Sequence, residues 1–272
     1  MASPYWVKTL INKTFSQRFF WSKLSNLPGI GRIIEYALFE NDDIIFLPKT
    51  RSISVNRAVE QKDNMVVPAD VLEHFIRKAN FHFIMDSCIC RDSTDCTDYP
   101  ISLGCIFLGE AAKGINPKFG RAASREEALE HAARCREAGL VHLIGRNKLD
   151  KVWLNVGPGE KLLTICNCCP CCCLWKVLPV ISPSIGSKVQ RMPGISVTVT
   201  EKCVGCGTCT RDICFVNAIN LDEEDHAVIG SGCRGCGRCV DACPQEAIEM
   251  KMEKTENVEE AINKISKLVD VS

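Results

Sequence analysis

The sequence predicts an α+β fold in which a mainly helical, cysteine-rich N-terminal domain is joined to a smaller C-terminal domain with short strands. Apolar residues recur at helical spacing over 68–78 and 124–137, whereas 195–199 alternates as a strand does. Proline and glycine concentrate in 179–194, which is therefore the best candidate for a linker. Nearly all of the 19 cysteines fall into three groups, at residues 88–105, 166–173 and 203–243.

The length and composition restrict the class of protein. A chain of 272 residues predicts about two domains, and 46% hydrophobic residues are enough for a sizeable core. Lys+Arg and Asp+Glu both number 33, which argues against a general nucleic-acid binder. No secretory leader and no run of 18 apolar residues is apparent. We therefore interpret the cysteines as metal ligands in a reducing cytoplasm, in an anaerobe where exposed clusters survive.

Residues 1–40 carry a stripe of aromatic and aliphatic side chains with basic residues between them. One interpretation is an amphipathic helix in which residues 5–24 touch a membrane surface peripherally. The other, which we favour, is a helix that packs on this protein or on a partner subunit. Residues 44–47 are the best strand that follows. The predicted divisions of the chain are 1–67, 68–190, 191–252 and a C-terminal helical segment, 253–272.

The region 68–190 begins with a helix, because Pro68 is tolerated in a first turn. Ser124 and Glu127 form a capping box that starts a second helix, and Gly139 ends it. The apolar runs 81–85 and 140–144 are expected to be extended.

The first cysteine group reads Cys88-x-Cys90-x5-Cys96-x8-Cys105. Four thiols are enough for one iron–sulfur cluster or one zinc ion, and free thiols are the third interpretation. In an extended chain the Cys-x-Cys pair would point both sulfurs to one side. We favour a third cluster on these four cysteines.

The second group places six thiols within eight residues, at Cys166, Cys168, Cys169, Cys171, Cys172 and Cys173. Such a run would be an oxidation hazard unless its sulfurs were ligated. Some of them could bind a cluster while the rest are buried, or they could combine with those of 88–105. A shared cluster with more than four cysteine ligands and a redox-active thiol pair beside a cluster are both open hypotheses.

The third group contains two near-copies of one pattern. They are Cys203-x2-Cys206-x2-Cys209-x4-Cys214 and Cys233-x2-Cys236-x2-Cys239-x3-Cys243-Pro244, and each is followed by Ala-Ile. This stretch resembles a bacterial-type two-cluster ferredoxin domain over residues 194–252. The resemblance implies crossed ligation of two 4Fe–4S clusters. One cluster would be bound by Cys203, Cys206, Cys209 and Cys243, and the other by Cys233, Cys236, Cys239 and Cys214.

The first copy departs from the family pattern in two ways. It has four residues rather than three before Cys214, and Phe215 stands where proline is usual. We expect a bulged turn near Cys214, which affects the potential of the second cluster more than its existence. Glycines beside the cysteines (Gly205, Gly207, Gly235 and Gly237) would permit close backbone approach to cluster sulfurs. A structural zinc site also uses paired Cys-x2-Cys motifs, but it needs no third cysteine at this spacing, so we favour clusters over zinc.

These observations support three hypotheses of function. The first is a multi-cluster electron carrier of anaerobic metabolism, which passes single electrons between redox partner proteins and one or two upstream clusters. The second is an iron–sulfur reductase whose active site is built from the 88–105 and 166–173 cysteines, flanked by Arg91, His131 or His142; its substrate would be a disulfide, another sulfur compound or a low-potential cofactor. The third is a scaffold for metal or cluster assembly.

Overall fold

A seven-stranded sheet forms the centre of the larger part of the protein. The computed structural model describes residues 2–49, 54–55, 68–254 and 256–272, so part of the predicted 1–67 region lies outside the described residues. The strand order is β5-β3-β4-β7-β6-β1-β8, and only the β1–β8 pair is parallel. The strands are β1 (Asp43–Phe46), β3 (His82–Met85), β4 (Ile106–Leu108), β5 (Gly120–Ala123), β6 (Val141–Arg146), β7 (Leu163–Cys168) and β8 (Val189–Arg191).

The protein is α+β as predicted, but the expectation of a mainly helical N-terminal domain is wrong, because this sheet is its core. Both faces of the sheet are covered, so its strands are continuous apolar runs rather than alternating ones. The expected linker 179–194 is also part of this core, since it contains α8 (Pro183–Gly186) and β8.

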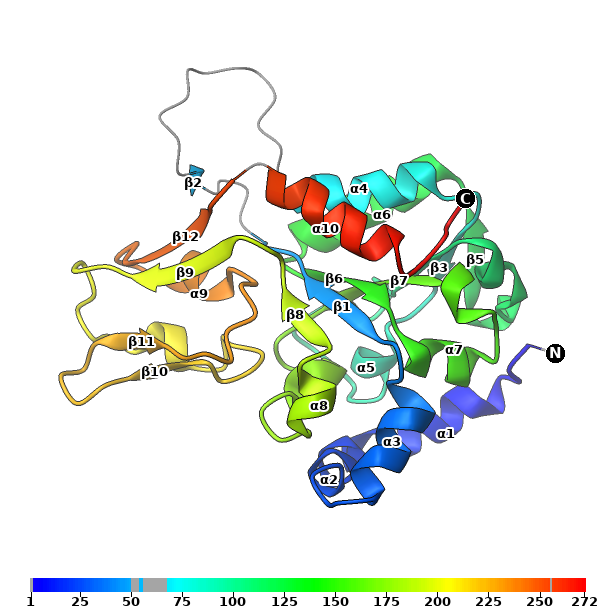
Figure 1. Cartoon of the computed structure of the whole chain (residues 1–272), viewed down its shortest axis with the longest axis horizontal. Helices are drawn as coiled ribbons and strands as arrows, with labels where there is room; N and C mark the ends of the chain where they lie inside the picture. Colours follow the sequence, from blue (N-terminus) through cyan, green and yellow to red (C-terminus); the bar gives the residue numbers. More distant parts are fainter. Residues whose placement is uncertain (1, 50–53, 56–67, 255) are drawn as a thin grey trace.

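Helices cover the two faces of the sheet (Figure 1). On one face lie α4 (Pro68–Lys78), α6 (Arg125–Glu137) and α10 (Glu256–Ser266). On the other side lie α1 (Trp6–Thr14), α2 (Arg18–Leu24), α3 (Ile30–Leu38), α5 (Ile89–Asp92), α7 (Lys148–Leu154) and α8. Single 3-10 turns join them: η1 (Phe15–Gln17), η2 (Glu110–Gly114), η3 (Pro117–Phe119), η4 (Gly159–Lys161), η5 (Leu174–Val177) and η6 (Thr208–Thr210).

The alternation of side chains along the strands divides the core in two. Ile84, Ile106 and Ile165 pack with the buried face of α4, together with Ala128 of α6 and Ala261 of α10. Their neighbours on the opposite face pack in other clusters, which include Phe46, Phe83, Phe107, Leu143, Cys166 and Cys168. Thiols of the second cysteine group therefore project from the face of the sheet that is opposite α4, α6 and α10.

The C-terminal part has its own small sheets. Strand β12 (Ile248–Met252) pairs with β9 (Ile195–Val199) and with β2 (Ser54–Val55), and β10 (Ile219–Leu221) pairs with β11 (Ala227–Ile229). The short helix α9 (Arg238–Ala242) follows the second cysteine repeat. The chain then returns to the large sheet, because α10 packs on α4 as a buried amphipathic helix.

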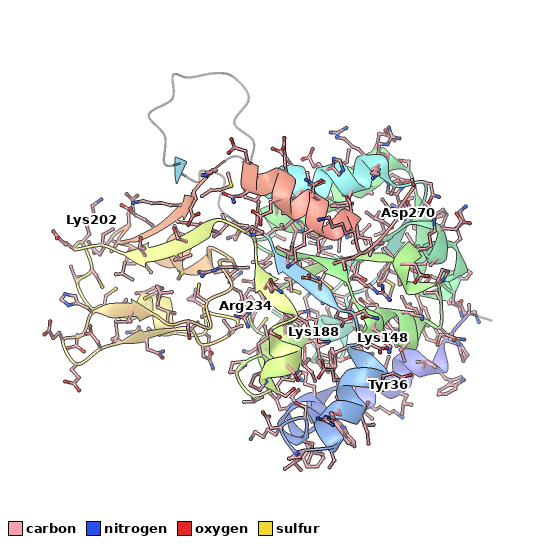
Figure 2. The ribbon with its side chains drawn as sticks, in the orientation of Figure 1. Tyr36, Lys148, Lys188, Lys202, Arg234 and Asp270 are labelled. Atoms are coloured by element: carbon pink, nitrogen blue, oxygen red, sulfur yellow. The ribbon has the colours of Figure 1, made fainter. Side chains whose placement is uncertain are left out.

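The N-terminal helices pack on the protein, but only in part. Phe15 is buried, and Lys8 of α1 forms an ion pair with Asp92 of α5 (Nζ–Oδ2 2.8 Å). Figure 2 shows Lys148 and Lys188 beside Tyr36 of α3, where Lys148 pairs with Glu40 and Lys188 with Glu35. Several large side chains stay exposed, namely Trp6, Leu10, Phe20, Trp21, Ile33 and Tyr36. No described helix has the length and apolar character needed to cross a membrane.

The capping box of α6 is confirmed. The Glu127 amide donates to Ser124 Oγ (3.1 Å), and the Ser124 amide donates to the Glu127 carboxylate (2.7 Å). We predict that Ser124→Ala lowers the free energy of unfolding by about 1 kcal/mol, because one helix donor loses its acceptor. Chemical denaturation followed by circular dichroism measures it. Glu130→Ala, on the exposed middle of the same helix, is the control, and an equal loss there would contradict a capping effect.

Candidate metal centres

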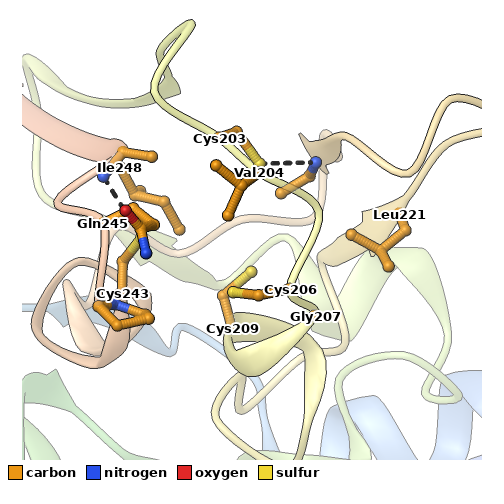
Figure 3. Close-up of a pocket in the computed structure, with 12 residues that line it drawn as sticks. Cys203, Val204, Cys206, Gly207, Cys209, Leu221, Cys243, Gln245 and Ile248 are labelled. Atoms are coloured by element: carbon orange, nitrogen blue, oxygen red, sulfur yellow. Dashed lines mark hydrogen bonds between the residues drawn. The ribbon is translucent and has the colours of Figure 1, made fainter.

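The eight cysteines of the repeat divide into two sets of four, in the crossed arrangement that the ferredoxin resemblance implies. The outer set (Cys203, Cys206, Cys209 and Cys243) lines one cavity, shown in Figure 3. The inner set (Cys214, Cys233, Cys236 and Cys239) lines a second cavity. Each cavity thus combines three thiols of one repeat with the last thiol of the other.

Backbone amides point at sulfurs of both sets. The amides of Ala218 and Ala247, from the Ala-Ile pair that follows each repeat, donate to Cys214 and Cys243 (both 3.3 Å). The amides of Ala227 and Gly235 donate to Cys203 and Cys233 (both 3.4 Å). Such bonds stabilise the charged thiolate, which is the form that binds metal.

Left-handed backbone makes the close turns of the repeats. Gly205, Gly207, Gly235 and Gly237 all have φ between 63° and 82°, where glycine carries no steric penalty. At Gly205 an added Cβ would lie 2.5 Å from the Asp225 carbonyl oxygen, so a side chain would displace that loop. The four glycines therefore make the left-handed turns of the repeats, and the amide of Gly235 donates to a cysteine sulfur, that of Cys233.

The two departures of the first repeat have separate structural roles. The additional residue is accommodated by a left-handed turn at Asp212 (φ 54°), two residues before Cys214. Phe215, in place of proline, is buried and packs edge-to-face on Phe46 of β1, with ring centroids 5.6 Å apart. A proline could not fill this space between the C-terminal part and the sheet. Phe215 therefore holds the inner set of thiols close to β1.

Polar contacts fix the same junction. The Lys49 amide donates to the Cys236 carbonyl (2.9 Å), and Lys49 Nζ lies 2.7 Å from the Asp241 carboxylate. Arg238, between Cys236 and Cys239, donates to the Gly139 carbonyl (2.9 Å) and to the Tyr99 hydroxyl (2.8 Å). The inner set is consequently attached to the loop that contains Cys96.

Burial raises the pKa of Cys236 and of Cys239 to about 12. Their thiols would be neutral at pH 7 without a compensating positive charge. A bound metal supplies that charge, because metal binding releases the thiol protons. The donor set, the cavity and the amides together fit a thiolate-bound cluster in each set.

The upstream cysteines are regrouped relative to the sequence prediction. Cys88, Cys90 and Cys105 lie with Cys166, Cys168 and Cys173, whereas Cys96 lies with Cys169, Cys171 and Cys172. The four cysteines of 88–105 are therefore divided between two sets. The hypothesis that the two upstream groups combine accounts for this arrangement.

The first upstream set is a ring of six thiols, which we call the six-thiol ring. Hydrogen-bonding neighbours are Cys88 with Cys90, Cys105 with Cys166, and Cys168 with both Cys166 and Cys173. Cys90 also interacts electrostatically with Cys173, and Cys105 with Cys88. The Cys168 and Cys173 sulfurs are 3.1 Å apart. The ring converges from four separate segments, which no local sequence constraint requires.

Register and capping position these thiols. Cys166 and Cys168 alternate on β7 and so share one face of the sheet. Strands β4 and β7 are antiparallel, and Ile106 lies opposite Ile165. The residues that come next in this register, Cys105 and Cys166, therefore lie side by side. The Cys88–Cys90 pair does not lie in an extended segment as expected. Cys88 is the N-cap of α5 and Cys90 lies within that helix, and the Cys88 carbonyl accepts from the Asp92 amide (2.9 Å).

Arg91 lies between the two upstream sets and is fully buried. Its guanidinium donates to the carbonyls of Pro100 (3.0 Å), Asn167 (2.8 Å) and Leu103. Desolvation by burial would lower its pKa, but electrostatic interaction with nearby cysteine sulfurs, that of Cys88 first, outweighs this and raises the pKa above its ordinary value. Arg91 is therefore a permanent cation that faces thiols of both sets.

The ring itself favours some ionised sulfurs. Hydrogen bonds from Cys105 and Cys168 lower the pKa of Cys166 well below its ordinary value, and the pKa of each of those donors is raised in return. The hydrogen bond from Cys90 lowers the pKa of Cys88 to about 7. Cys88 and Cys166 are thus the ring thiols that ionise most readily, and the thiolate is the form that binds metal.

Asn167 organises the opposite face of β7. Its side-chain amide donates to the Gly104 carbonyl (2.6 Å), and His142 Nδ1 donates to its Oδ1 (2.7 Å). His131 Nε2 donates to the same Gly104 carbonyl (2.9 Å). The two histidines considered as flanking groups are therefore supports for the loop that precedes Cys105. The role of Asn167 was not predicted, although its position between Cys166 and Cys168 was a usable signal.

Comparisons with known proteins bear on the C-terminal part. Residues 210–254 match the family described as LdpA Fe-S cluster-binding domain. Over 54 residues the chain is 39% identical to pyruvate synthase subunit PorD of Methanothermobacter marburgensis, a match that covers 20% of this chain and 62% of that protein. The chain thus spans less than two thirds of that curated relative. No solved structure matches. The C-terminal part is an iron–sulfur-binding, ferredoxin-like domain.

The buried position of Arg91 predicts that its replacement destabilises the fold. Arg91→Met should lower the free energy of unfolding by about 3–5 kcal/mol, because two buried carbonyls and a partly buried one lose their donor and buried thiolates lose their counter-charge. Arg91→Lys should recover only part of this, since it keeps the charge but cannot span all three carbonyls. Denaturation of the anaerobically purified chain measures both. Arg77→Met, at an exposed arginine, is the control; an unchanged midpoint for Arg91→Met would disprove the proposed charge balance.

Proposed function

We propose that this protein is a multi-cluster iron–sulfur electron carrier of anaerobic metabolism, working in a reducing cytoplasm. Two 4Fe–4S clusters would be bound by the outer and inner sets, and a further cluster by thiols of the six-thiol ring. One observation carries the proposal. Inner-set thiols (Cys214, Cys233 and Cys236) and ring thiols (Cys166, Cys168 and Cys173) pack in the same apolar core cluster. The two kinds of site are thus joined through dry protein rather than across solvent.

The outer set would receive or deliver electrons at the surface. Cys206 is the exposed thiol of this set, and Val204 beside it is 65% exposed. Leu221, which lines the same cavity, and Val228 are also exposed. Apolar side chains around an exposed ligand suit the transient docking of a redox partner protein. PorD is named as a subunit of pyruvate synthase, so a partner enzyme of that kind is consistent with the likeness.

The residues around the ring would keep it dry and balance its charge. Helix α1 covers α5 through Lys8 and Asn12, both of which contact the Asp92 carboxylate. Arg18 of α2 approaches Cys90 and Cys173 closely enough for electrostatic contact, and Arg91 lies on the inner side. When bound, a cluster supplies the exchange of single electrons; the chain supplies thiolates, positive charge and exclusion of water.

One observation favours a reductase as the second candidate. The ring has six thiols, two more than the four that a cube requires, and Cys168 and Cys173 are in contact. In its disulfide form such a pair could accept two electrons, one at a time, from an adjacent cluster together with two protons. The resulting dithiol could then reduce a disulfide substrate by thiol–disulfide exchange, which returns the pair to its disulfide form. This candidate requires that Cys173→Ser abolish reductase activity while the iron content is unchanged.

Removing one ligand from each set tests the carrier. Wild-type protein purified without oxygen should contain about 12 irons or more per chain, at four per cluster, and should accept more than two electrons on reductive titration. Cys206→Ser and Cys236→Ser should each lose about four irons and four sulfides. Eight irons in the wild type would show that the ring holds no cluster, and so would contradict the relay.

Electron paramagnetic resonance distinguishes a relay from isolated centres. In the fully reduced chain the ring signal should be broadened by the nearby inner cluster. Cys236→Ser should remove this broadening, whereas Cys206→Ser, which affects the outer cluster, should leave most of it. Equal effects of the two variants would mean that the inner set is not the neighbour of the ring.

A further inference from the structure

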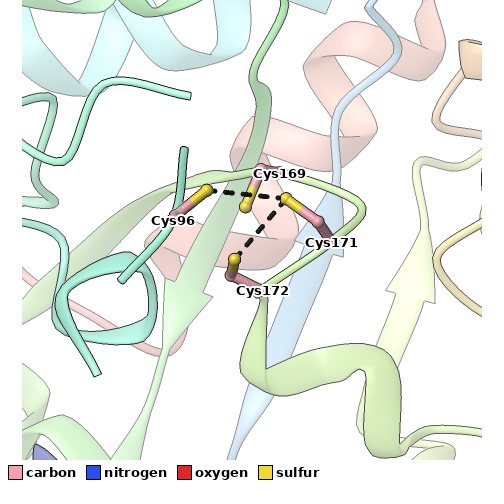
Figure 4. Close-up of side chains that lie close together, drawn as sticks. All are labelled: Cys96, Cys169, Cys171 and Cys172. Carbon is pink, nitrogen blue, oxygen red and sulfur yellow. Dashed lines mark hydrogen bonds between the residues drawn. The ribbon is translucent and has the colours of Figure 1, made fainter. Parts of the chain in front are cut away.

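The second upstream set differs in geometry from every other group of thiols. Cys96, Cys169, Cys171 and Cys172 place their four sulfurs within 4.8 Å of one another (Figure 4). The Cys171 sulfur lies 3.7 Å from that of Cys96 and 3.5 Å from that of Cys172. Among the described residues, no other group of three or more possible ligand atoms is so compact.

This spacing decides between one ion and a cube. Thiolates at 2.3 Å from a tetrahedral zinc ion lie about 3.8 Å from one another, which matches the observed contacts. The sulfurs around a cube must stand farther apart, because each binds a different iron at a corner of the cube. In neither the inner nor the outer ferredoxin set do three sulfurs lie within 4.8 Å of one another. The same fold thus contains both kinds of thiol arrangement.

The surroundings suit a closed site. Cys169 is 1% and Cys172 6% exposed, and both pack with Leu103 and Leu140. Four thiolates around a divalent ion leave a net charge of minus two, and the buried Arg91 guanidinium faces Cys169 to offset it. No carboxylate or histidine belongs to this group of ligand atoms. Four sulfur ligands with no open position are typical of a structural ion rather than a catalytic one.

The chain is shaped locally to bring these ligands together. Asp95 is left-handed (φ 47°), and the Cys96 amide donates back to the Arg91 carbonyl (3.0 Å), so the loop after α5 turns Cys96 inward. Pro170 stands in the turn that follows β7, between Cys169 and Cys171. The site therefore connects two loops that are 75 residues apart in the sequence.

We propose that Cys96, Cys169, Cys171 and Cys172 bind a single tetrahedral metal ion, Zn²⁺ or Fe²⁺, separate from all iron–sulfur clusters. This ion links the 88–105 loop to the 169–173 turn, both of which also carry thiols of the six-thiol ring. Its role is to hold the two loops at a fixed separation. It goes beyond the electron-carrier proposal, which requires neither this ion nor its position.

Element-specific analysis of the full chain tests the site. Zinc, iron and acid-labile sulfide are counted in anaerobically purified wild type, Cys96→Ser and Cys171→Ser. Each variant should lose one metal ion per chain with no loss of sulfide. X-ray absorption at the edge of the lost metal should give four sulfur neighbours at about 2.3 Å if that metal is zinc. An iron ion would instead appear as one iron lost with sulfide unchanged, which also supports the proposal.

The control is Cys135→Ala. Cys135 is a buried thiol that packs beside Cys169 and Cys172 but lies outside the group of four. This variant should keep every metal ion. Loss of about four irons and four sulfides in Cys171→Ser would mean a cube and would overturn the proposal, as would metal content equal to that of the wild type.

A second measurement, on the wild type alone, distinguishes loss of the metal site from misfolding of a variant. Absorption at the metal edge of the wild type requires no substitution, and a shell with fewer than four sulfurs around a zinc ion would itself overturn the assignment. Failure of the electron-carrier proposal would appear differently, as a deficit of iron and sulfide in the wild type. The two outcomes are therefore distinguishable in one set of analyses.

Discussion

Burying negative charge is the constraint on which the upstream half of the structure depends. Ten thiols converge on the two upstream sets around Arg91, and each becomes a good ligand only as a thiolate. The buried Arg91 balances this negative charge, because its guanidinium is always charged and is held in place by hydrogen bonds to three carbonyls. The same carbonyls belong to strand β7 and to the loop between Cys96 and Cys105, which carry the ligands. Charge balance and loop position are therefore set by one side chain.

The attachment of the ferredoxin-like part follows from a departure from the usual motif. Phe215 stands where the family has proline, and its ring packs on Phe46 of the large sheet. A proline at this position would serve a free-standing ferredoxin, whereas an aromatic ring provides contact area for docking. The turn that accommodates the additional residue before Cys214 lies directly beside it. What looked in the sequence like a weakened repeat is thus the contact between the two parts.

The parts of the site that could be predicted depend on residues close together in the sequence, whereas the parts that could not depend on residues far apart in it. In the C-terminal repeat, spacing alone places three thiols per set, and the family resemblance supplies the fourth; both cavities have the expected lining. The apolar runs at 81–85 and 140–144 do become strands. Their assembly into one sheet was missed, because strands buried on both faces lack the alternation that identifies them. The aromatic stripe of residues 1–40 was similarly ambiguous, since Phe15 is buried while Trp6 is exposed.

Strand register explains why the upstream thiols could not be grouped from the sequence. Ile106 of β4 pairs with Ile165 of β7, and this pairing places Cys105 beside Cys166 across 60 residues of chain. A shift of one residue would turn Cys166 and Cys168 to the other face, among the α4 and α6 side chains, and put Asn167 in the ring. Cys96 does not join the six-thiol ring. Its sulfur lies with those of Cys169, Cys171 and Cys172, which are in the turn that follows β7. The sequence contains the ligands, but the sheet decides which of them meet.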